Sequence, residues 1–172
     1  LGSYYTPDSI ASEIAGRLYT RGPLFLDPCC GTGQFLLAFA ERYGSADSVW
    51  GIDIDPVAVN LARINLMLMF PQRDGCPNVF CSDSLMDYNE LLLFNNMNAL
   101  PEFDVIATNP PWGSHYKKDE LARLLYYYPE VTSGESFSCF LVKSMRMLKE
   151  KGCLSFVLPE SVLNVKMHGD IR

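Results

Sequence analysis

The sequence is poor in the residues and patterns that mark several protein classes. It has only two histidines, and none of its six cysteines forms a Cys-x-x-Cys pair, so no metal site is expected. Apolar stretches such as Leu91–Phe94 are far too short to span a bilayer. The first residues do not pair a basic segment with an apolar one, so no secretory signal is recognised. We therefore expect a cytoplasmic protein with reduced thiols and no membrane segment.

Positive charge is also scarce. Lys and Arg number 14 against 20 Asp and Glu, which gives a formal net charge of −6. Attraction to phosphates supplies most non-specific affinity for nucleic acids. A nucleic-acid partner would therefore need a local basic surface or a region outside this chain. Hydrophobic residues make up 48% and charged residues 20% of the 172 positions, which is typical of one globular domain.

Short apolar runs alternate with amphipathic segments along the chain. This alternation predicts an α/β fold, with a doubly wound, mostly parallel sheet covered by helices on both faces. Strands are expected at residues 24–27, 49–53, 78–81, 103–108 and 154–158. Helices are expected at residues 8–19, from Gly33 to Gly44, after Asp55, around 90–94, near 119–127 and at 137–149, with Gly152 ending the last one.

Apolar periodicity also predicts which helix faces point inward. The first helix should bury Ile10, Ile14 and Leu18, the second Leu36, Phe39, Ala40 and Tyr43, the third Val57, Leu61, Ile64 and Leu68, and the last Phe137, Phe140, Leu141, Met145 and Leu148. Asp55 is expected to cap the third helix, with Pro56 in its first turn.

A glycine-containing loop follows the first strand and leads into a helix. Gly31 and Gly33 allow the backbone to turn tightly and approach a ligand. The loop lacks the third glycine of a dinucleotide fingerprint, because Leu36 stands there, and it lacks the Gly-Lys-Ser/Thr of a P-loop. Asp27 before the loop suits a cationic ligand, and Asp53 after the next strand is placed to accept hydrogen bonds from ribose hydroxyls. S-adenosyl-L-methionine fits this pattern, and another nucleotide-binding Rossmann domain is the alternative.

A second motif, Asn109, Pro110, Pro111 and Trp112, follows the fourth strand at the sheet edge where doubly wound folds bind ligands. An exocyclic aromatic amine is a poor nucleophile because its lone pair is delocalised into the ring. The Asn109 side-chain oxygen and the Pro110 carbonyl can accept hydrogen bonds from both N–H groups, which would localise that lone pair. Trp112 offers a face on which an extruded base can stack. The alternative is an ordinary proline-rich turn.

These motifs together resemble the N6-adenine branch of the amino-directed DNA methyltransferases, the enzymes of restriction–modification systems. The matching segments are residues 5–7, 27–33, 51–53, 82–84 and 109–112. The resemblance implies a Rossmann-like class I methyltransferase fold, base flipping and direct methyl transfer. It further implies that Thr6 holds the methionine carboxylate of the cofactor and that Asp83 binds its adenine amine. Without the resemblance, Thr6-Pro7 would be an ordinary helix cap and Asp83 a loop carboxylate.

The resemblance also shapes the expectations for domains and partners. Residues 1–172 are expected to form a single methyltransferase catalytic domain that is a fragment of a longer protein, because the family's last strands and any target-recognition domain would follow Arg172. That downstream region would bind DNA, and a specificity or restriction subunit is a possible partner. The alternative substrates are an RNA base or a protein glutamine amide, although the glutamine enzymes usually carry Tyr in place of Trp112. A cofactor-binding scaffold without catalysis is the third hypothesis.

Overall fold

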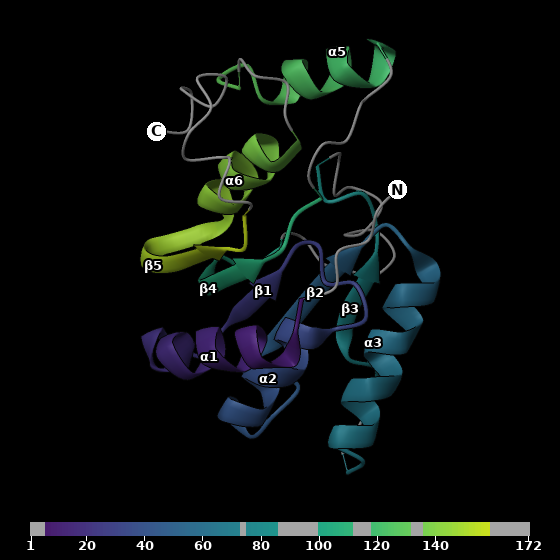
Figure 1. Cartoon of the computed structure of the whole chain (residues 1–172), viewed down its shortest axis with the longest axis vertical. Helices are drawn as coiled ribbons and strands as arrows, with labels where there is room; N and C mark the ends of the chain where they lie inside the picture. The colour runs from purple at the N-terminus through teal and green to yellow at the C-terminus, as the bar shows by residue number, and fades with distance from the viewer. Residues whose placement is uncertain (1–5, 73–74, 86–99, 112–117, 132–135, 159–172) are drawn as a thin grey trace.

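A single parallel sheet organises the molecule. The computed structural model describes residues 6–72, 75–85, 100–111, 118–131 and 136–158 (Figure 1). In this part of the chain the strands are β1 (Phe25–Asp27), β2 (Val49–Asp53), β3 (Asn78–Cys81), β4 (Phe103–Thr108) and β5 (Leu148–Phe156). Their spatial order is β3-β2-β1-β4-β5, and all pairs are parallel. The chain leaves β1 in one direction through β2 and β3 and returns to its other side with β4, which confirms the doubly wound α/β prediction.

Helices cover both faces of this sheet (Figure 1). The helices of the described residues are α1 (Asp8–Leu18), α2 (Gln34–Tyr43), α3 (Pro56–Met69), α5 (Lys118–Tyr127) and α6 (Ser136–Met147), with a short 3₁₀ turn at Tyr19–Arg21. Of these, α5 packs against α6 and not on a face of the sheet. Successive strand residues point to opposite faces. Phe25 therefore packs in the core shared with α1, α2 and α3, whereas Leu26 packs on the other side with Met147 of α6.

Local helix signals are located where the sequence predicts them. The Asp55 side chain caps α3 by accepting a hydrogen bond from the Val57 backbone N–H at 2.8 Å, and Pro56 occupies the first turn. Gly44 ends α2 with a left-handed φ of 69°. The bounds predicted for β2, β3 and β4 also agree with the structure.

The predicted inward face of α3 is wrong. Its expected members are exposed: Val57 by 64%, Leu61 by 44%, Ile64 by 51% and Leu68 by 74%. The residues buried against the sheet are Val59, Ala62 and Leu66. Almost every side of this helix is apolar, so periodicity alone does not identify the buried one. On this side α3 comes close to the loop before α2, since a Cβ placed on Gly33 would lie only 3.1 Å from the Ala62 Cβ.

The end of α6 also differs from the prediction. The helix stops at Met147, and β5 begins at Leu148, so Gly152 lies within the strand and does not end the helix. Leu148 pairs with Phe103 and Cys153 with Val105, so the intervening residues of β5 form a bulge. A Cβ on Gly152 would lie 2.6 Å from Leu148 Cγ, which explains the glycine there.

Other inward residues need smaller corrections. Ile10 and Met145 are exposed, and Ala11 and Ala15 are the buried residues of α1. Leu36, Phe39, Ala40, Phe137 and Phe140 are buried as expected. The helix predicted around residues 90–94 lies outside the described residues.

The described ranges were searched for membrane-spanning helices, groups of metal ligands and disulfides. Within them, no helix is long and apolar enough to cross a membrane, and no group of three potential metal ligands gathers. The six cysteines all lie within these ranges, and none of them forms a disulfide.

Candidate functional site

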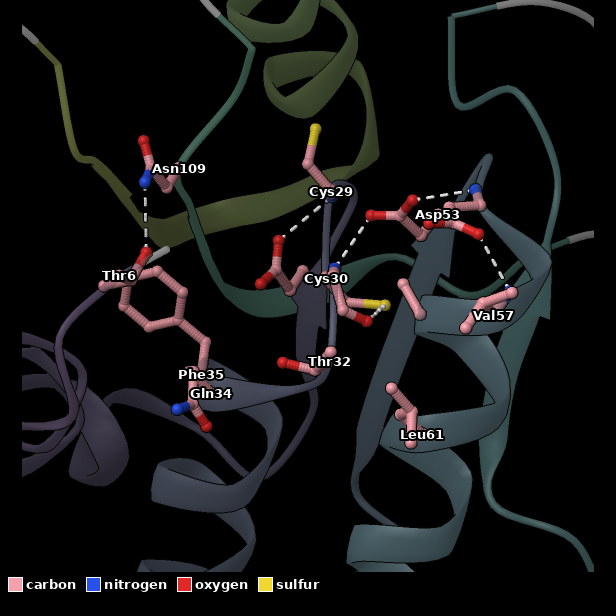
Figure 2. Close-up of a pocket in the computed structure, with 14 residues that line it drawn as sticks. Thr6, Cys29, Cys30, Thr32, Gln34, Phe35, Asp53, Val57, Leu61 and Asn109 are labelled. Carbon is pink, nitrogen blue, oxygen red and sulfur yellow. Dashed lines mark hydrogen bonds between the residues drawn. The ribbon is translucent and has the colours of Figure 1, made fainter. Parts of the chain in front are cut away.

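A cavity of about 230 Å³ opens at the carboxyl end of the sheet (Figure 2). Its lining includes Asp27 from the end of β1, Asp53 from the end of β2 and Asn109 directly after β4. Thr6, which precedes α1, contributes to the same wall. Parallel strands thus gather at one edge residues that are far apart in the sequence.

The loop between β1 and α2 is held by hydrogen bonds to the neighbouring strand. Gly31 and Gly33 adopt left-handed φ values of 51° and 96°, which favour glycine. The Gly31 N–H donates to Asp53 Oδ2 at 2.8 Å, and the Cys30 N–H donates to the Ile52 carbonyl at 3.0 Å. A Cβ on Gly31 would meet nothing within 4 Å, so this part of the loop is open to a ligand.

Asp27 is a buried carboxyl at the floor of the site. It is 2% exposed, and its Oδ1 accepts a hydrogen bond from the Cys29 N–H at 3.0 Å. Burial raises the pKa of Asp27 from 3.8 to about 7. A cationic ligand group would favour the ionised form, so this residue suits a positively charged ligand.

The thiols of the adjacent residues Cys29 and Cys30, beside Asp27, are not activated as nucleophiles. Burial, and then the nearby Asp27 charge, raise the pKa values of Cys29 and Cys30 well above 9.0. Both thiols therefore stay protonated and are poor nucleophiles. They line the cavity as small loop side chains.

Asp53 is held rigidly by the backbone around it. Its Oδ2 accepts from Gly31, and its Oδ1 accepts from the Asp55 N–H at 2.9 Å. A carboxylate has about four lone-pair positions, so each oxygen can accept a further hydrogen bond. The geometry is compatible with two hydroxyl donors of a ribose.

Asn109 is paired with the residue before the first helix. Its Nδ2 donates to the Thr6 Oγ1 at 3.1 Å. Of the pair Thr6-Pro7, it is Pro7 that occupies the cap position of α1, and that helix end has no side-chain cap hydrogen bond. Pro110 is buried next to Asn109.

Ser136, the first residue of α6, was not identified from the sequence. It is fully buried, and its Oγ donates to the Pro111 carbonyl at 2.6 Å. The hydrogen bond ties the loop after β4 to the start of α6. A serine at a helix start is too common a feature to indicate this contact, which depends on the tertiary fold.

Four described residues of the expected site are not among those that line the cavity: Gly33, Asp83, Pro110 and Pro111. Asp83 follows β3 at the same sheet edge, where its Oδ1 accepts a hydrogen bond from the Leu85 N–H at 3.0 Å. Its neighbour Ser84 donates to the Pro28 carbonyl at 2.5 Å, so the loops after β3 and β1 are joined. Trp112 lies outside the described residues.

The cavity combines groups of different character. It has a buried acid at Asp27, a hydrogen-bond acceptor at Asp53 and an apolar wall from Val57 and Leu61 on α3, residues that periodicity had placed in the core. In a ligand with a cationic group, a diol and an aromatic ring, the cationic group would pair with Asp27, the diol with Asp53 and the ring with the apolar wall. S-adenosyl-L-methionine has all three, so the residues present fit this cofactor.

Comparisons with known proteins agree with this geometry. The model of a family described as N-6 DNA Methylase matches residues 1–172. The type II methyltransferase M.VspI from Vibrio sp. (strain 343) is 30% identical over 173 residues, covering 99% of this chain and 40% of the relative. The methylase subunit of the type I restriction enzyme MjaIX from Methanocaldococcus jannaschii is 25% identical over 187 residues, covering 99% of this chain and 31% of the relative.

A solved structure supports the fold. The methyltransferase subunit of a type I restriction-modification system from Streptococcus thermophilus superposes with a TM-score of 0.72 at 23% identity, over 99% of this chain and 37% of that chain. The predicted Rossmann-like class I methyltransferase fold is confirmed. The chain spans well under half the length of these relatives.

Proposed function

Because this chain belongs to the N-6 DNA methylase family, we propose that it transfers a methyl group from S-adenosyl-L-methionine to the N6 amino group of adenine in DNA. The family predicted from the sequence is confirmed, and the residues that line the cavity support the predicted cofactor. The observation that carries the proposal is that three of the expected site residues line one cavity. Asn109, the expected acceptor for the amine, lines the same cavity as the two carboxylates expected to bind the cofactor, Asp27 and Asp53.

The cofactor would be held by residues from several loops. The ionised Asp27 faces the cationic groups, and Asp53 accepts from the ribose hydroxyls. Gly31 and Gly33 let the backbone approach, while Thr6 binds the methionine carboxylate. Asp83 is proposed to reach the cofactor's adenine amine from the loop after β3. When bound, S-adenosyl-L-methionine supplies the methyl group that becomes attached to the nitrogen.

The loop after β4 would prepare the substrate. The Asn109 Oδ1 and the Pro110 carbonyl each accept a hydrogen bond from the amine, which concentrates its lone pair on the nitrogen. Pro110 and Pro111 have no N–H donors that would compete for these acceptors. Ser136 holds the Pro111 carbonyl, and Trp112 is proposed to stack on the flipped base.

A restriction–modification setting follows from the kind of relatives found. One relative is named a type II methyltransferase, and another is named a methylase subunit of a type I restriction enzyme. We propose that a region of the protein outside residues 1–172 recognises DNA, and that a specificity or restriction subunit is a partner. The net charge of −6 supports this division, because the chain itself attracts phosphates poorly.

The experiment incubates the full-length protein with methyl-labelled cofactor and, separately, with DNA, RNA and protein. We expect label in DNA, loss of labelling in Asn109→Ala, and normal labelling in Asn60→Ala, an exposed residue of α3 outside the cavity lining. Label found only in RNA or only in protein would refute the DNA assignment. Cofactor binding without label in any of the three would refute catalysis and favour the scaffold hypothesis.

A further inference from the structure

The cavity is lined by acidic side chains, and no basic side chain is found among its described lining residues. Asp27, Asp53 and Asp55 each contribute a carboxyl group, whereas Lys, Arg and His are absent from the described lining. None of the three carboxyls takes part in an ion pair between described residues. Asp27 is the most deeply buried, at 2% exposed, while Asp53 is partly exposed and Asp55 is exposed. The described part of the cavity therefore holds a buried acid with no cation beside it.

The groups that act on Asp27 come from three elements, and none of them is positively charged. In its own loop, the Cys29 N–H donates to Oδ1 at 3.0 Å, and the thiols of Cys29 and Cys30 are protonated. At the end of β2, Asp53 adds negative charge, and backbone N–H groups hold both of its oxygens (Figure 2). From β4, the fully buried Thr108 places its hydroxyl beside the carboxyl, although not in the geometry of a regular hydrogen bond.

A basic side chain near the cofactor loop, Arg63 of α3, is engaged elsewhere. Its Nε and Nη2 both donate to the Val79 carbonyl, at 2.9 and 2.6 Å, and its charge is not among those that shift the pKa of Asp27. An isolated carboxylate is so costly to bury that such a group takes up a proton instead. Burial accordingly raises the pKa of Asp27 to about 7.

We propose that the empty cavity keeps a proton on Asp27 and that the cationic cofactor displaces it, so that binding releases a proton to solvent. The inference rests on the proposed function, in which the cationic groups of the cofactor face Asp27. The carboxyl O–H bond breaks, the proton passes to solvent, and the carboxylate pairs with the cation; no other bond changes. A neutral nucleoside leaves the proton in place. The site thereby selects for positive charge, and its occupancy depends on pH.

The size of the effect follows from the pKa of Asp27 in the two states. With a pKa of about 7 in the empty site and a return to the ordinary value of 3.8 beside a cation, Asp27 releases about 0.9 proton per ligand at pH 6. Because the cation pairs with the ionised form, affinity falls as pH falls below about 7. The Kd should rise about eightfold from pH 6.5 to pH 5.5, a range in which the ligand's amino group, with an ordinary pKa near 8, stays charged.

The first test is calorimetric titration of the full-length protein without DNA. Heats measured at pH 6 in two buffers of different ionisation enthalpy give the number of protons released. S-adenosyl-L-methionine carries an ammonium and a sulfonium group, S-adenosylhomocysteine carries only the ammonium, and 5′-methylthioadenosine carries neither. We expect release of about 0.9 proton with S-adenosyl-L-methionine and no release with 5′-methylthioadenosine. Release with S-adenosylhomocysteine identifies the ammonium as the partner of Asp27, and its absence there identifies the sulfonium.

Two variants assign the proton to Asp27. Asp27→Asn should release none, and its Kd for the cofactor should stay constant between pH 5.5 and 6.5. Asp47→Asn, which removes an exposed carboxyl outside the cavity lining, should release as much as the parent. If Asp27→Asn binds too weakly for calorimetry, infrared difference spectra of the parent decide the question. In protein carrying ¹³C-labelled aspartate, S-adenosyl-L-methionine should remove the C=O band of a protonated aspartic acid.

Any of three results would overturn the proposal. One is binding of S-adenosyl-L-methionine at pH 6 without proton release and without loss of the protonated-acid band. Another is equal release by the parent and Asp27→Asn, which would place the proton on a different group. The third is equal release with 5′-methylthioadenosine, which would remove the role of the cation. These measurements use no DNA, so they are distinct from failure of the proposed function, which would appear as cofactor binding without methylated DNA.

Discussion

Asp27→Asn should stabilise the ligand-free protein while weakening cofactor binding. Burial raises the pKa of Asp27 from 3.8 to about 7, so the folded state holds a proton that the unfolded state releases. Stability therefore falls as pH rises from about 4 to 7, by about 1.4 kcal/mol for each unit of pKa difference. The difference is near three units, so ionising Asp27 costs up to about 4 kcal/mol at pH 8. Asparagine avoids this cost, and its side-chain oxygen can still accept from the Cys29 N–H.

The assay is urea unfolding of ligand-free parent protein and Asp27→Asn between pH 5 and 8. The advantage of the variant should grow as pH rises and be largest at pH 8. Asp47→Asn, at an exposed position, serves as a charge-matched control and should follow the parent. Calorimetric titration should show that the variant binds the cofactor more weakly than the parent does, because its asparagine side chain offers no negative charge to the cationic groups of the cofactor. If the free energies of unfolding of parent and variant changed with pH in parallel, the reasoning about the buried carboxyl would be refuted.

The remaining predictions concern packing and loop position. Leu66→Ala, at a fully buried position of α3, should lower the free energy of unfolding by about 2–5 kcal/mol. Leu68→Ala, 74% exposed, should lower it by less than about 0.5 kcal/mol; equal losses in urea unfolding would contradict the assigned face. Ser136→Ala should cost about 1 kcal/mol by losing the hydrogen bond to Pro111, and it should lower kcat more than it changes the KM for cofactor. A Ser136→Ala enzyme with full kcat would show that this bond does not position the loop.

Much of the site was predictable because its signals are local. Asp27 and Asp53 are the last residues of their strands and Asn109 directly follows β4, and parallel strands bring their carboxyl ends to one edge. The tight turn predicted at Gly31 and Gly33 agrees with their left-handed φ values. For these residues, a correct strand assignment is sufficient to place them together.

The errors arose where the local pattern allowed two answers. The helix α3 is apolar on opposite sides, and the side that is buried carries Val59, Ala62 and Leu66. Gly152 looked like a helix terminator, but it permits a bulge that folds back on Leu148. Hydrophobicity and glycine content did not distinguish these possibilities.

Long-range hydrogen bonds could not be predicted from the sequence. The pair Thr6–Asn109 spans 103 positions, and Ser136 reaches Pro111 across 25. Neither contact leaves a periodic or compositional trace, because a hydroxyl and its partner need only one suitable distance in the folded chain. The roles of Asp83 and Trp112 stay predictions that rest on the family resemblance.

The central claim is tested most directly by identifying the methylated nucleoside. DNA treated with full-length protein and S-adenosyl-L-methionine is digested to nucleosides and separated by chromatography with mass detection. We predict N6-methyl-2′-deoxyadenosine as the product, absent when the enzyme carries Asn109→Ala. Methylation of cytosine instead, or the same adenine product from Asn109→Ala, would contradict the account.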